Sequence, residues 1–578
     1  MPSNREIRRL FNLYAELLLL HNQNERLAAL LSGAAYRLRN ISEEVMGLSK
    51  KELSKQFRPE IIKALDELKN TSTVEALDEL VQLTPQGIFE MMRIRGLGGK
   101  KLSVLWKTAG IDSIDVLLAA CKKNKLSKIP GFGVKTQQNI INAIEAYRSS
   151  KDRFHYASVA ETATALVQSL QHICKTKLIE LCGEVRRQSL TVNGIEILAA
   201  VSQKNMNKDA LRKFLIMQSR ISLKYHNTKY KHHSDIKTSF RGQEVTQAHT
   251  LDEIPVTIYH TSKDDFYYRL FLRTGNESHV QKVLNKIKGK HNYMSEEAIY
   301  KKAKLPYIVP EMREDVAEWN FNKPASSLIT AEDIKGVVHN HTTWSDGIDT
   351  LTDFVHACKS RHYEYVVISD HSKNAHYAGG LKEEKVLRQM QEIDKLNKQL
   401  EAQQKSGQPF KIFKSIECDI LVSGELDYAN DLLQLFDLVI ISVHQLLKMD
   451  EAKATKRLIK AVENPYTTIL GHVSGRQLLI RPGYPLNYKK VIDACAANRV
   501  VIEVNANPYR LDIDWQHISY ALNKGVMISI NPDAHSIAEI NNIRWGVAAA
   551  RKGGLTKDHT WNAMSLKEVE QWLKKRKH

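Results

Sequence analysis

The sequence predicts a multidomain protein with an α-helical N-terminal part, an α+β middle part and a C-terminal parallel α/β sheet or barrel. The chain has 578 residues, which is more than one hydrophobic core normally serves. Up to about residue 150, apolar side chains recur at spacings of three and four, the period of an amphipathic helix. From Lys335 onward, short apolar runs alternate with helical segments, an order typical of parallel sheets and barrels.

The composition indicates a basic globular protein. Hydrophobic residues make up 43% and charged residues 26% of the chain, as in ordinary soluble domains. The net charge of +19 favours a polyanionic partner such as nucleic acid, and a basic excess that serves only solubility is the alternative. Six cysteines are scattered without a CxxC pair, which argues against a disulfide framework or a cysteine zinc finger and favours the cytoplasm.

Residues 1–82 are expected to be helical. Their apolar spacing is seen in Leu10, Leu13, Leu17 and Leu20, and again in Ile61, Leu65 and Leu68. The run MPSNREIRRLFNLYAELLLL has charges before its apolar part and no small-residue cleavage site after it, so it predicts an amphipathic helix rather than a signal peptide. No stretch of about 18 uncharged apolar residues predicts a membrane span, and we expect no membrane partner.

Residues 83–150 contain two glycine-rich turns between helical segments. The turns read Arg95-Gly96-Leu97-Gly98-Gly99-Lys100-Lys101 and Ile129-Pro130-Gly131-Phe132-Gly133-Val134-Lys135. Such a turn exposes N–H groups at a helix N-terminus, where a phosphate can bind without base contacts. Together they resemble a tandem helix-hairpin-helix, and plain turns are the alternative. The residues expected to bind the DNA backbone here are Gly96, Gly98, Lys100, Lys101, Gly131, Gly133 and Lys135.

Residues 151 to about 320 mix β-branched runs with helical patterns and predict an α+β region. Within this region, the stretch from Lys204 to Arg241 is dense in Lys and Arg and has very few acids. It is either a solvated basic face or a groove that binds a nucleic acid backbone. Residues 316–334 carry a proline and no clean period, and are expected to form a linker.

Every predicted strand from Lys335 onward ends in residues that can bind a metal. The strand segments are GVVHNH, YVVISDH, FKSIECDI, LVIISVH, TTILGHV, VVIEVN and VMISINPDAH. Their polar ends carry His339, His341, Asp370, His371, Glu417, Asp419, His444, His472, Glu503, Asp533 and His535. Because the carboxyl ends of parallel strands meet at one edge, these side chains are expected to converge. A lone buried His is more often a core residue, but a whole series at successive strand ends favours a site for zinc, manganese or iron.

The spacing within the first of these segments adds a local prediction. Alternation along His339-Asn340-His341 puts both imidazoles on the same side of an extended chain. That arrangement is the one that chelation of a single ion requires.

Seven motifs in this region resemble the polymerase-and-histidinol-phosphatase (PHP) domain, and in particular that of bacterial family X DNA polymerases. The motifs are GVVHNHTTWSDG, VISDHS, IECD, SVHQ, GHVSGR, EVNANPYRLD and NPDAHS, within residues 335–578. The resemblance implies a distorted (β/α)7 barrel with three divalent metal ions, Mn2+ or Zn2+, with iron as a further option. It implies one ion on His339, His341, Glu417 and Asp533, a second that shares Glu417 and adds His444 and His472, and a third on Asp346, His371 and His535.

The same resemblance implies 3′–5′ exonuclease activity, or abasic-site cleavage or 3′-phosphate removal, favoured by manganese. Clustered divalent cations lower the pKa of a bridging water and neutralise charge that builds on a phosphoryl oxygen. Arg476 and Arg510 follow strand ends and are expected to hold flanking phosphates, with surface ion pairs as the alternative. The residues expected to act in catalysis are His339, His341, Glu417, His444, Asp533, Arg476 and Arg510.

The rest of the chain resembles the core of a family X polymerase in order and length. The implied domains are a helical DNA-binding domain (1–82), helix-hairpin-helix fingers (83–150), a nucleotidyltransferase-like palm (151–235), a thumb (236–315), the linker (316–334) and the PHP domain (335–578). Arg186 and Arg187, in the turn Gly183-Glu184-Val185-Arg186-Arg187, are expected to bind DNA. Arg273-Thr274-Gly275-Asn276 resembles the thumb motif.

The carboxylates that such a palm needs are not retained. Glu184 stands where a serine should contact the triphosphate, Gly194 and Glu196 stand in the first two Asp positions, and Thr257 stands in the third. Glu196 alone cannot hold two magnesium ions. The resemblance therefore predicts a degenerate palm that binds DNA without nucleotidyl transfer.

We expect a bacterial, cytoplasmic, monomeric phosphodiesterase or phosphatase that processes 3′ ends of nicked or gapped DNA in repair. Three alternatives remain open. The first is a working repair polymerase with a proofreading PHP domain, which the lost carboxylates disfavour. The second is a small-molecule phosphatase of the histidinol-phosphate type, which needs neither hairpins nor a large positive charge. The third is a DNA-binding scaffold without catalysis, which the full set of ligands disfavours.

Overall fold

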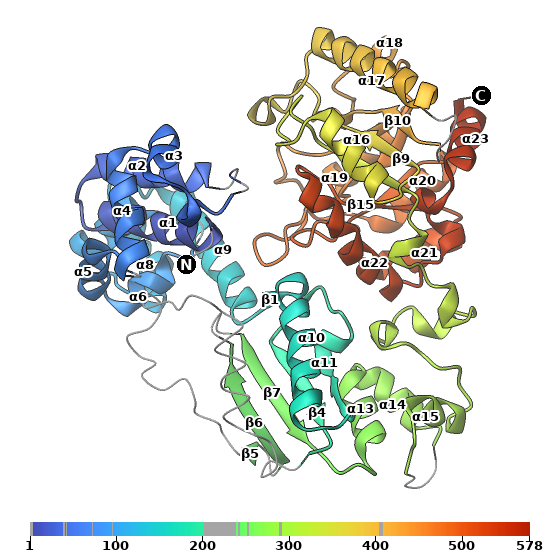
Figure 1. Ribbon diagram of the computed structural model, residues 1–578, viewed down its shortest axis with the longest axis horizontal. Helices are drawn as coiled ribbons and strands as arrows, with labels where there is room; N and C mark the ends of the chain where they lie inside the picture. Colours follow the sequence, from blue (N-terminus) through green and yellow to red (C-terminus); the bar gives the residue numbers. More distant parts are fainter. Residues whose placement is uncertain are drawn as a thin grey trace. The chain divides into compact units, whose positions relative to one another are not determined.

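A computed structural model describes residues 4–38, 41, 43–71, 73–94, 96–201, 239–240, 243–250, 254–287, 292–403 and 409–577 (Figure 1). Arg95 and almost all of the basic stretch Lys204–Arg241 lie outside the described residues. The described residues form two compact units: 4–152 with 247–256, and 153–201 with 239–246 and 257–577, within the ranges just given.

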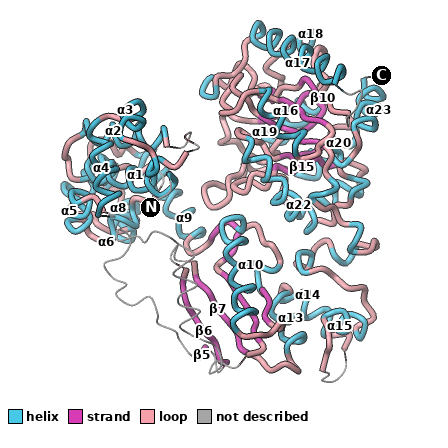
Figure 2. The backbone as a smooth tube through the Cα atoms, in the orientation of Figure 1, coloured by secondary structure: helices cyan, strands magenta, loops and turns pink. Residues whose placement is uncertain are grey.

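Residues 4–152 of the first unit are helical, as the apolar spacing predicted, and contain no strand where they are described (Figure 2). Its helices are α1 (Asn4–Leu20), α2 (Glu25–Arg37), α3 (Lys50–Gln56), α4 (Pro59–Thr71), α5 (Glu75–Leu83), α6 (Gln86–Met91), α7 (Gly99–Ser103), α8 (Ile114–Lys122) and α9 (Val134–Ser150). The buried face of α1 includes Ile7, Phe11 and Leu17. Leu10 and Leu13 are only partly buried at the edge of this face, because the helical period places them beside it.

The second unit begins with a small α+β region. Its elements are β1 (Phe154–His155), α10 (Tyr156–Ile173), β2 (Ile179–Leu181), α11 (Gly183–Arg186), β3 (Thr191–Val192), β4 (Ile195–Ala199), β5 (Ser239–Phe240), β6 (Gln243–His249), β7 (Pro255–His260), α13 (Phe266–Thr274), α14 (Glu277–Leu284) and α15 (Glu296–Lys302). Five strands form one sheet in the order β2-β4-β7-β6-β5, and β1 pairs with β3. The expected mixture of helices and strands is confirmed, whereas the palm and thumb assignments stay predictions.

The C-terminal region consists of parallel strands and helices in alternation. The strands are β8 (Gly336–Asn340), β9 (Tyr365–Ile368), β10 (Lys411–Lys414), β11 (Glu417–Asp419), β12 (Val439–Ser442), β13 (Thr467–Leu470), β14 (Val501–Asn505) and β15 (Ile528–Asn531). The helices are α16 (Leu351–Ser360), α17 (Glu383–Gln403), α18 (Asn430–Leu433), α19 (Glu451–Val462), α20 (Tyr488–Ala497), α21 (Ile518–Asn523), α22 (Ile543–Lys552) and α23 (Leu566–Lys577). The predicted segment FKSIECDI is two strands, β10 and β11, which belong to different sheets.

The parallel strands form two sheets that are joined at both ends. One sheet has the order β10-β9-β8 and the other the order β11-β12-β13-β14-β15. Isolated parallel bridges link His371 to Glu417 and Asn340 to Ala534. The strands β8, β9, β12, β13, β14 and β15 are buried along their whole length, which explains why they read as unbroken apolar runs rather than as alternating ones.

The predicted linker, residues 316–334, packs against the C-terminal region. Leu328 and Ile329 are buried, and the Ile329 N–H donates to the Leu555 carbonyl at 3.0 Å. The buried Lys552 ammonium joins the C-terminal region to the segments before the linker, because its Nζ lies 2.6 Å from Glu314 Oε1 and 2.9 Å from the Arg187 carbonyl. A buried ammonium group is tolerable only with partners of this kind.

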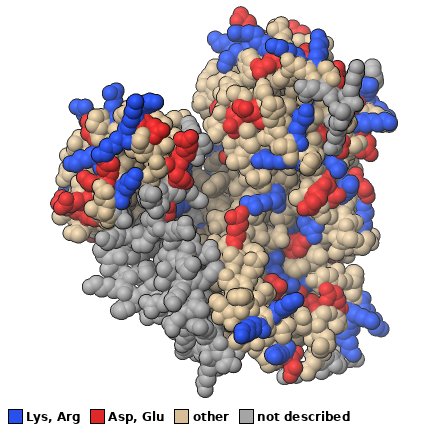
Figure 3. All heavy atoms as spheres, in the orientation of Figure 1, with Lys and Arg blue, Asp and Glu red and all other residues tan. Residues whose placement is uncertain are grey.

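Surface charge is mixed on the face drawn in Figure 3, where basic and acidic side chains of the described residues lie interspersed. No single basic patch dominates that view. Among the described helices, none combines the length and the apolar character that a bilayer crossing would need.

The close packing of β8 on β9 generates a first prediction. A Cβ added to Gly336 would lie 1.9 Å from the ring of Tyr365, which is fully buried and donates from its hydroxyl to the Met564 carbonyl. Gly336→Ala should therefore destabilise the second unit by about 1–3 kcal/mol, measured by thermal unfolding. Gly33→Ala, in open space within α2, is the control and should stabilise its helix by about 0.5–1 kcal/mol. Equal stability of the wild type and the Gly336 variant would contradict the packing.

Candidate metal centre

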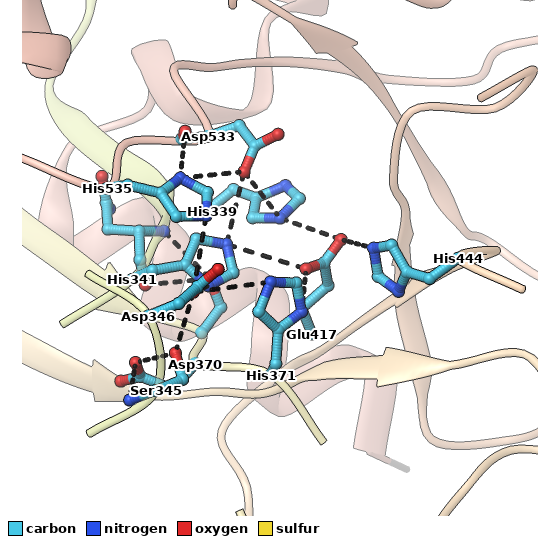
Figure 4. A network of polar contacts seen from close by, with 12 residues as sticks. His339, His341, Ser345, Asp346, Asp370, His371, Glu417, His444, Asp533 and His535 are labelled. Carbon is cyan, nitrogen blue, oxygen red and sulfur yellow. Dashed lines mark hydrogen bonds and ion pairs between the residues drawn. The ribbon is translucent and has the colours of Figure 1, made fainter. Parts of the chain in front are cut away.

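Eight of the nine predicted metal ligands lie in or just after the carboxyl-terminal part of a parallel strand, and Glu417 follows the end of β10 as the first residue of β11. Figure 4 labels all of them except His472. His339 lies in β8, Glu417 begins β11, and the other seven follow β8, β9, β12, β13 or β15 within a few residues: His341, Asp346, His371, His444, His472, Asp533 and His535. Because these strands run parallel and are joined into one circuit, their ends face one shared space.

Glu417 lies at the centre of the cluster and is 1% exposed. Its Oε1 lies 3.2 Å from His339 Nε2, 3.2 Å from His444 Nε2 and 2.9 Å from His472 Nε2. Its Oε2 lies 2.9 Å from His371 Nδ1. A single carboxylate therefore contacts imidazoles that come from four different strand ends.

Two further carboxylates complete the cluster. Asp533 Oδ1 lies 3.3 Å from His341 Nε2 and 3.6 Å from His339 Nε2. Asp346 Oδ1 lies 3.6 Å from His371 Nε2 and 3.5 Å from His535 Nε2. Figure 4 shows the labelled side chains pointing toward one another.

The donor set fits divalent metal ions. Three groups have ligand atoms within 4.8 Å of one another: His341, Asp346, His371 and His535; His339, His341 and Asp533; and His371, Glu417 and His444. Both ring nitrogens of the fully buried His341 have no hydrogen-bond partner. Buried polar atoms left unpaired are costly, and coordination to a cation would satisfy them.

The ligand grouping differs in detail from the one that the resemblance implied. His341 belongs to two of the three groups, and His371 joins Glu417 as well as Asp346. His472 is in none of the groups, although its Nε2 contacts Glu417. The assignment of each residue to a particular ion stays a prediction.

The ionisation of the cluster follows from its burial and its close charges. Burial alone would raise the pKa of Glu417, but His444, His339 and His371 outweigh it and hold that pKa well below its usual value. Burial opposes a charged His444, yet Glu417 and Asp419 raise its pKa to about 10. Burial lowers the pKa of His341 to about 3, together with His535 and His371, so this imidazole is neutral with a free lone pair. A cation that binds here would displace the proton of His444.

Carboxylates outside the nine ligands orient two of the imidazoles. Glu503 Oε2 lies 2.6 Å from His339 Nδ1, and Asp419 pairs with His444 Nδ1. Glu503 also accepts from the His472 N–H at 2.9 Å and from Asn531 at 2.8 Å. Such partners fix the tautomer and orientation of a ligating His. The sequence placed both acids among the candidate metal-binding residues, and only the fold shows which imidazole each one meets.

The backbone at two ligands is unusual and corrects the predicted alternation. His339 and Asp533 have φ of 65° and 51°, a left-handed conformation that costs about 1–3 kcal/mol and clusters at functional sites. The pairing of β8 with β9 shifts register between Val337 and Asn340, so β8 is not regularly extended at His339. Both imidazoles still reach the cluster, while the Asn340 amide turns away to the Val337 and Val367 carbonyls.

The two predicted phosphate-binding arginines differ. Arg510 Nε lies 3.5 Å from Asp533 Oδ2, and its side chain is 19% exposed, so it borders the cluster. Arg476 pairs with Asp514 and donates to the carbonyls of Arg510 and Leu511. Arg476 is thus engaged inside the protein, which favours the ion-pair alternative, while its role toward a phosphate stays a prediction.

The two hairpins present different helix ends. Gly96 and Gly131 both have positive φ, 88° and 86°, as tight turns require. At the first hairpin, the Gly99 N–H at the start of α7 donates to the Glu16 carboxylate, so an internal anion already lies there. At the second hairpin, Gly133 caps α9 without a side-chain acceptor.

The lysines of the hairpins also differ. Lys100 pairs with Glu25 at 2.9 Å, and Lys101 donates to the Gly96 carbonyl at 3.0 Å. Lys135, at the start of α9, is exposed. Gly98 precedes α7 as its cap residue. Binding of DNA by these residues stays a prediction.

The arginines expected to bind DNA from the palm have partners inside the second unit. Arg186 makes a bidentate pair with Glu296, at 3.0 and 2.6 Å. Arg187 Nε lies 3.1 Å from Glu314, and both arginine side chains are largely buried. Their geometry is that of structural ion pairs and weighs against phosphate contact.

The acidic residues at the predicted palm positions have partners within the protein. A Cβ on Gly183 would lie 1.8 Å from Glu196 Oε2, and Tyr259 donates to Glu196 at 3.0 Å. Glu184 pairs with Arg153 at 3.1 Å. Glu196 and Glu184 therefore have partners within the protein.

Comparison with known proteins agrees with this architecture. A family model described as a SAM-like helix-hairpin-helix tandem matches residues 89–146, which confirms the predicted motif. The protein named DNA polymerase/3′-5′ exonuclease PolX from Bacillus subtilis (strain 168) is 31% identical over 520 residues, 89% of each chain. A probable phosphatase from Thermoanaerobacter sp. (strain X514) is 27% identical over 177 residues, 29% of this chain and 69% of that protein.

One solved structure overlaps more loosely. The histidinol phosphate phosphatase of Lactococcus lactis, complexed with zinc, L-histidinol and phosphate, is 17% identical. The overlap covers 39% of this chain and 95% of that one with a TM-score of 0.28, too low for anything to follow from it.

The clustered imidazoles and carboxylates, together with these relatives, define a metal-dependent hydrolase. The chain belongs to the PolX family, the bacterial family X DNA polymerases with a PHP domain. The resemblance drawn from the sequence motifs is confirmed.

The buried Glu503 generates the second prediction. Glu503→Gln should lower metal affinity about 10–100-fold, because the neutral amide holds His339 in place less firmly. Metal content after dialysis against a chelator series measures the effect. Glu425→Gln, at an exposed pair with Lys460, is the control and should bind metal like the wild type. Unchanged affinity in the Glu503 variant would exclude an orienting role.

Proposed function

We propose that this chain is a 3′–5′ exonuclease or 3′-end-processing phosphoesterase of DNA repair, with its chemistry in a PHP barrel formed by residues 335–578. The observation that carries the proposal is the contact of Glu417 with four imidazoles from separate strand ends. The alternation of parallel strands with helices, joined at both ends, supports a (β/α)7 barrel.

The residues of the cluster would hold two or three divalent ions, manganese or zinc, with iron also compatible with this ligand type. Bound ions at such a site activate water and offset the negative charge that develops on a phosphate ester. His339, His341, Glu417, His444 and Asp533 would hold these ions in place. Arg510 borders the cluster and is positioned to pair with a phosphate oxygen.

The palm-like region would bind DNA without transferring nucleotides. The partners of Glu184 and Glu196 support this part of the proposal. A triphosphate would meet the Glu184 carboxylate where a hydroxyl is required, and like charges repel. The alternative, a working repair polymerase, would show as metal-dependent primer extension on gapped DNA.

DNA would be held mainly through its phosphate backbone. The second hairpin supports this, because no side chain caps α9 at Gly133 and Lys135 in its first turn is exposed. The protein would act on nicked or gapped DNA. It would be a monomer and would work in the cytoplasm. The six cysteines are unpaired, as in a reducing compartment.

Removal of two ligands tests the site. The double variant His339→Ala, His341→Ala should lose manganese-stimulated release of nucleotides from a 3′-labelled DNA, because two of the three ligand groups are broken. DNA affinity should remain near that of the wild type, since the hairpins are untouched. His356→Ala, exposed on α16, is the control and should retain activity. Persistence of the nuclease in the double variant would refute the assignment.

The hairpins generate a further prediction. Lys135→Ala should weaken binding to all DNA sequences alike and reduce the slope of log K against log salt by about one. Lys100→Ala should have a smaller effect, because its ammonium is already paired with Glu25. Salt-dependent binding isotherms measure both variants. A loss confined to particular sequences would argue against backbone recognition.

A further inference from the structure

Two loops border the metal centre beside β13 and β14. The Arg476 loop comprises residues 473–483 and the Arg510 loop comprises residues 506–514. The Leu478 N–H donates to the Tyr509 carbonyl at 2.7 Å, and Arg476 Nε donates to the Arg510 carbonyl at 3.0 Å. The two loops are therefore hydrogen-bonded to each other over several residues and are expected to move together.

The Arg510 loop carries a cation beside the metal ligands. Arg510 Nε lies 3.5 Å from Asp533 Oδ2, and the preceding residue, Tyr509, is 51% exposed. A guanidinium on a loop is positioned only as well as the loop is held. The hydrogen bonds from Arg476 hold one side of the Arg510 loop.

A histidine from the α+β region holds the other side of the Arg510 loop. His155, in β1, donates from Nε2 to the Leu478 carbonyl at 3.1 Å. Its ring also packs edge-to-face against Tyr509, with centroids 4.8 Å apart and planes at 72°. His155 thus contacts both loops at the point where they are joined. Burial lowers the pKa of His155 even though the Leu478 carbonyl favours its charged form, so the ring is neutral at physiological pH.

Contacts between β1 and the α+β region position His155. In the pairing of β1 with β3, His155 lies opposite Thr191. The preceding Arg153 donates to the Thr191 carbonyl and hydroxyl and pairs with Glu184. Glu184 is the residue that stands in place of the triphosphate-binding serine. The substitution that disfavours nucleotidyl transfer therefore also anchors the strand that carries His155.

We propose that His155 is a positioning residue for the hydrolytic site: it clamps the Arg476 and Arg510 loops so that Arg510 faces the metal-ligating Asp533. The palm-like region then supports hydrolysis as well as binding DNA. This inference rests on the proposed function, because it assigns Arg510 to a phosphate of the substrate.

A double-mutant cycle in the full-length protein tests the clamp. His155→Ala should lower kcat for release of nucleotides from a 3′-labelled DNA about ten-fold, because small displacements of a charged group cost rate steeply. Arg510→Ala should lower it further. The double variant should match Arg510→Ala alone, because His155 acts through Arg510. Metal content should be the same in all of them.

Two further variants separate positioning from general stability. Glu161→Gln removes an exposed pair with Arg544, 2.7 Å, that joins the same regions away from both loops, and it should keep kcat within about two-fold. His155→Gln retains an N–H that can reach the Leu478 carbonyl and should recover part of the rate. If His155→Ala does not fold, His155→Gln with Arg510→Ala completes the cycle.

The possible outcomes are distinct. Full activity of His155→Ala, multiplicative losses in the double variant, or loss of bound metal would each overturn the clamp. Full activity of Arg510→Ala, with none in the His339→Ala, His341→Ala variant, would overturn the clamp and leave the proposed function intact. Full activity in that double ligand variant would instead refute the proposed function.

Discussion

The structure of the second unit depends on one constraint: parallel strands joined into a circuit bring all their carboxyl ends to one edge. As a consequence, the two carboxylate oxygens of Glu417 contact imidazoles from four strand ends. So many charged and polar groups, buried together, are costly unless each has a partner. The cluster therefore fits a site for cations, and the ring nitrogens of His341, which have no hydrogen-bond partner, are the clearest sign of it.

A buried layer of carboxylates and amides supports the ligands. Glu503 holds the imidazole of His339 and the backbone of His472 at the same time. Asn505 links Glu503 to Asp533 by donating to both, at 2.9 and 3.0 Å. Ligands that are far apart in the sequence are thus connected by a single hydrogen-bonded network, which keeps their geometry fixed before any ion binds.

The charged side chains of the predicted palm region pair within the protein. Glu196 lies against Gly183 and accepts from Tyr259, and Glu184 pairs with Arg153. Arg186, in the same turn, pairs with Glu296. Each of these charges has a partner, without which its burial would be costly. The region forms a sheet with helices, and its His155 contacts the two loops beside the metal centre.

The sequence by itself determined the helical first unit, the parallel strands and the convergence of nine metal-binding side chains, because periodicity and strand-end position are local properties. It predicted which side chains gather at the strand ends more completely than it predicted the partners of those side chains. Glu503 and Asp419 were visible only as acids at strand ends, and Arg186 and Arg476 only as cations near turns.

Only the tertiary structure decided which partner each of these groups meets. Three of these contacts join residues that are separated by tens to hundreds of positions. They are Arg186 with Glu296, Glu16 with the α7 terminus, and His155 with Leu478. Such contacts arise when distant elements pack, so no local pattern encodes them. The register shift in β8 near His339 also depends on the packing of distant elements, because it is a feature of the pairing of β8 with β9.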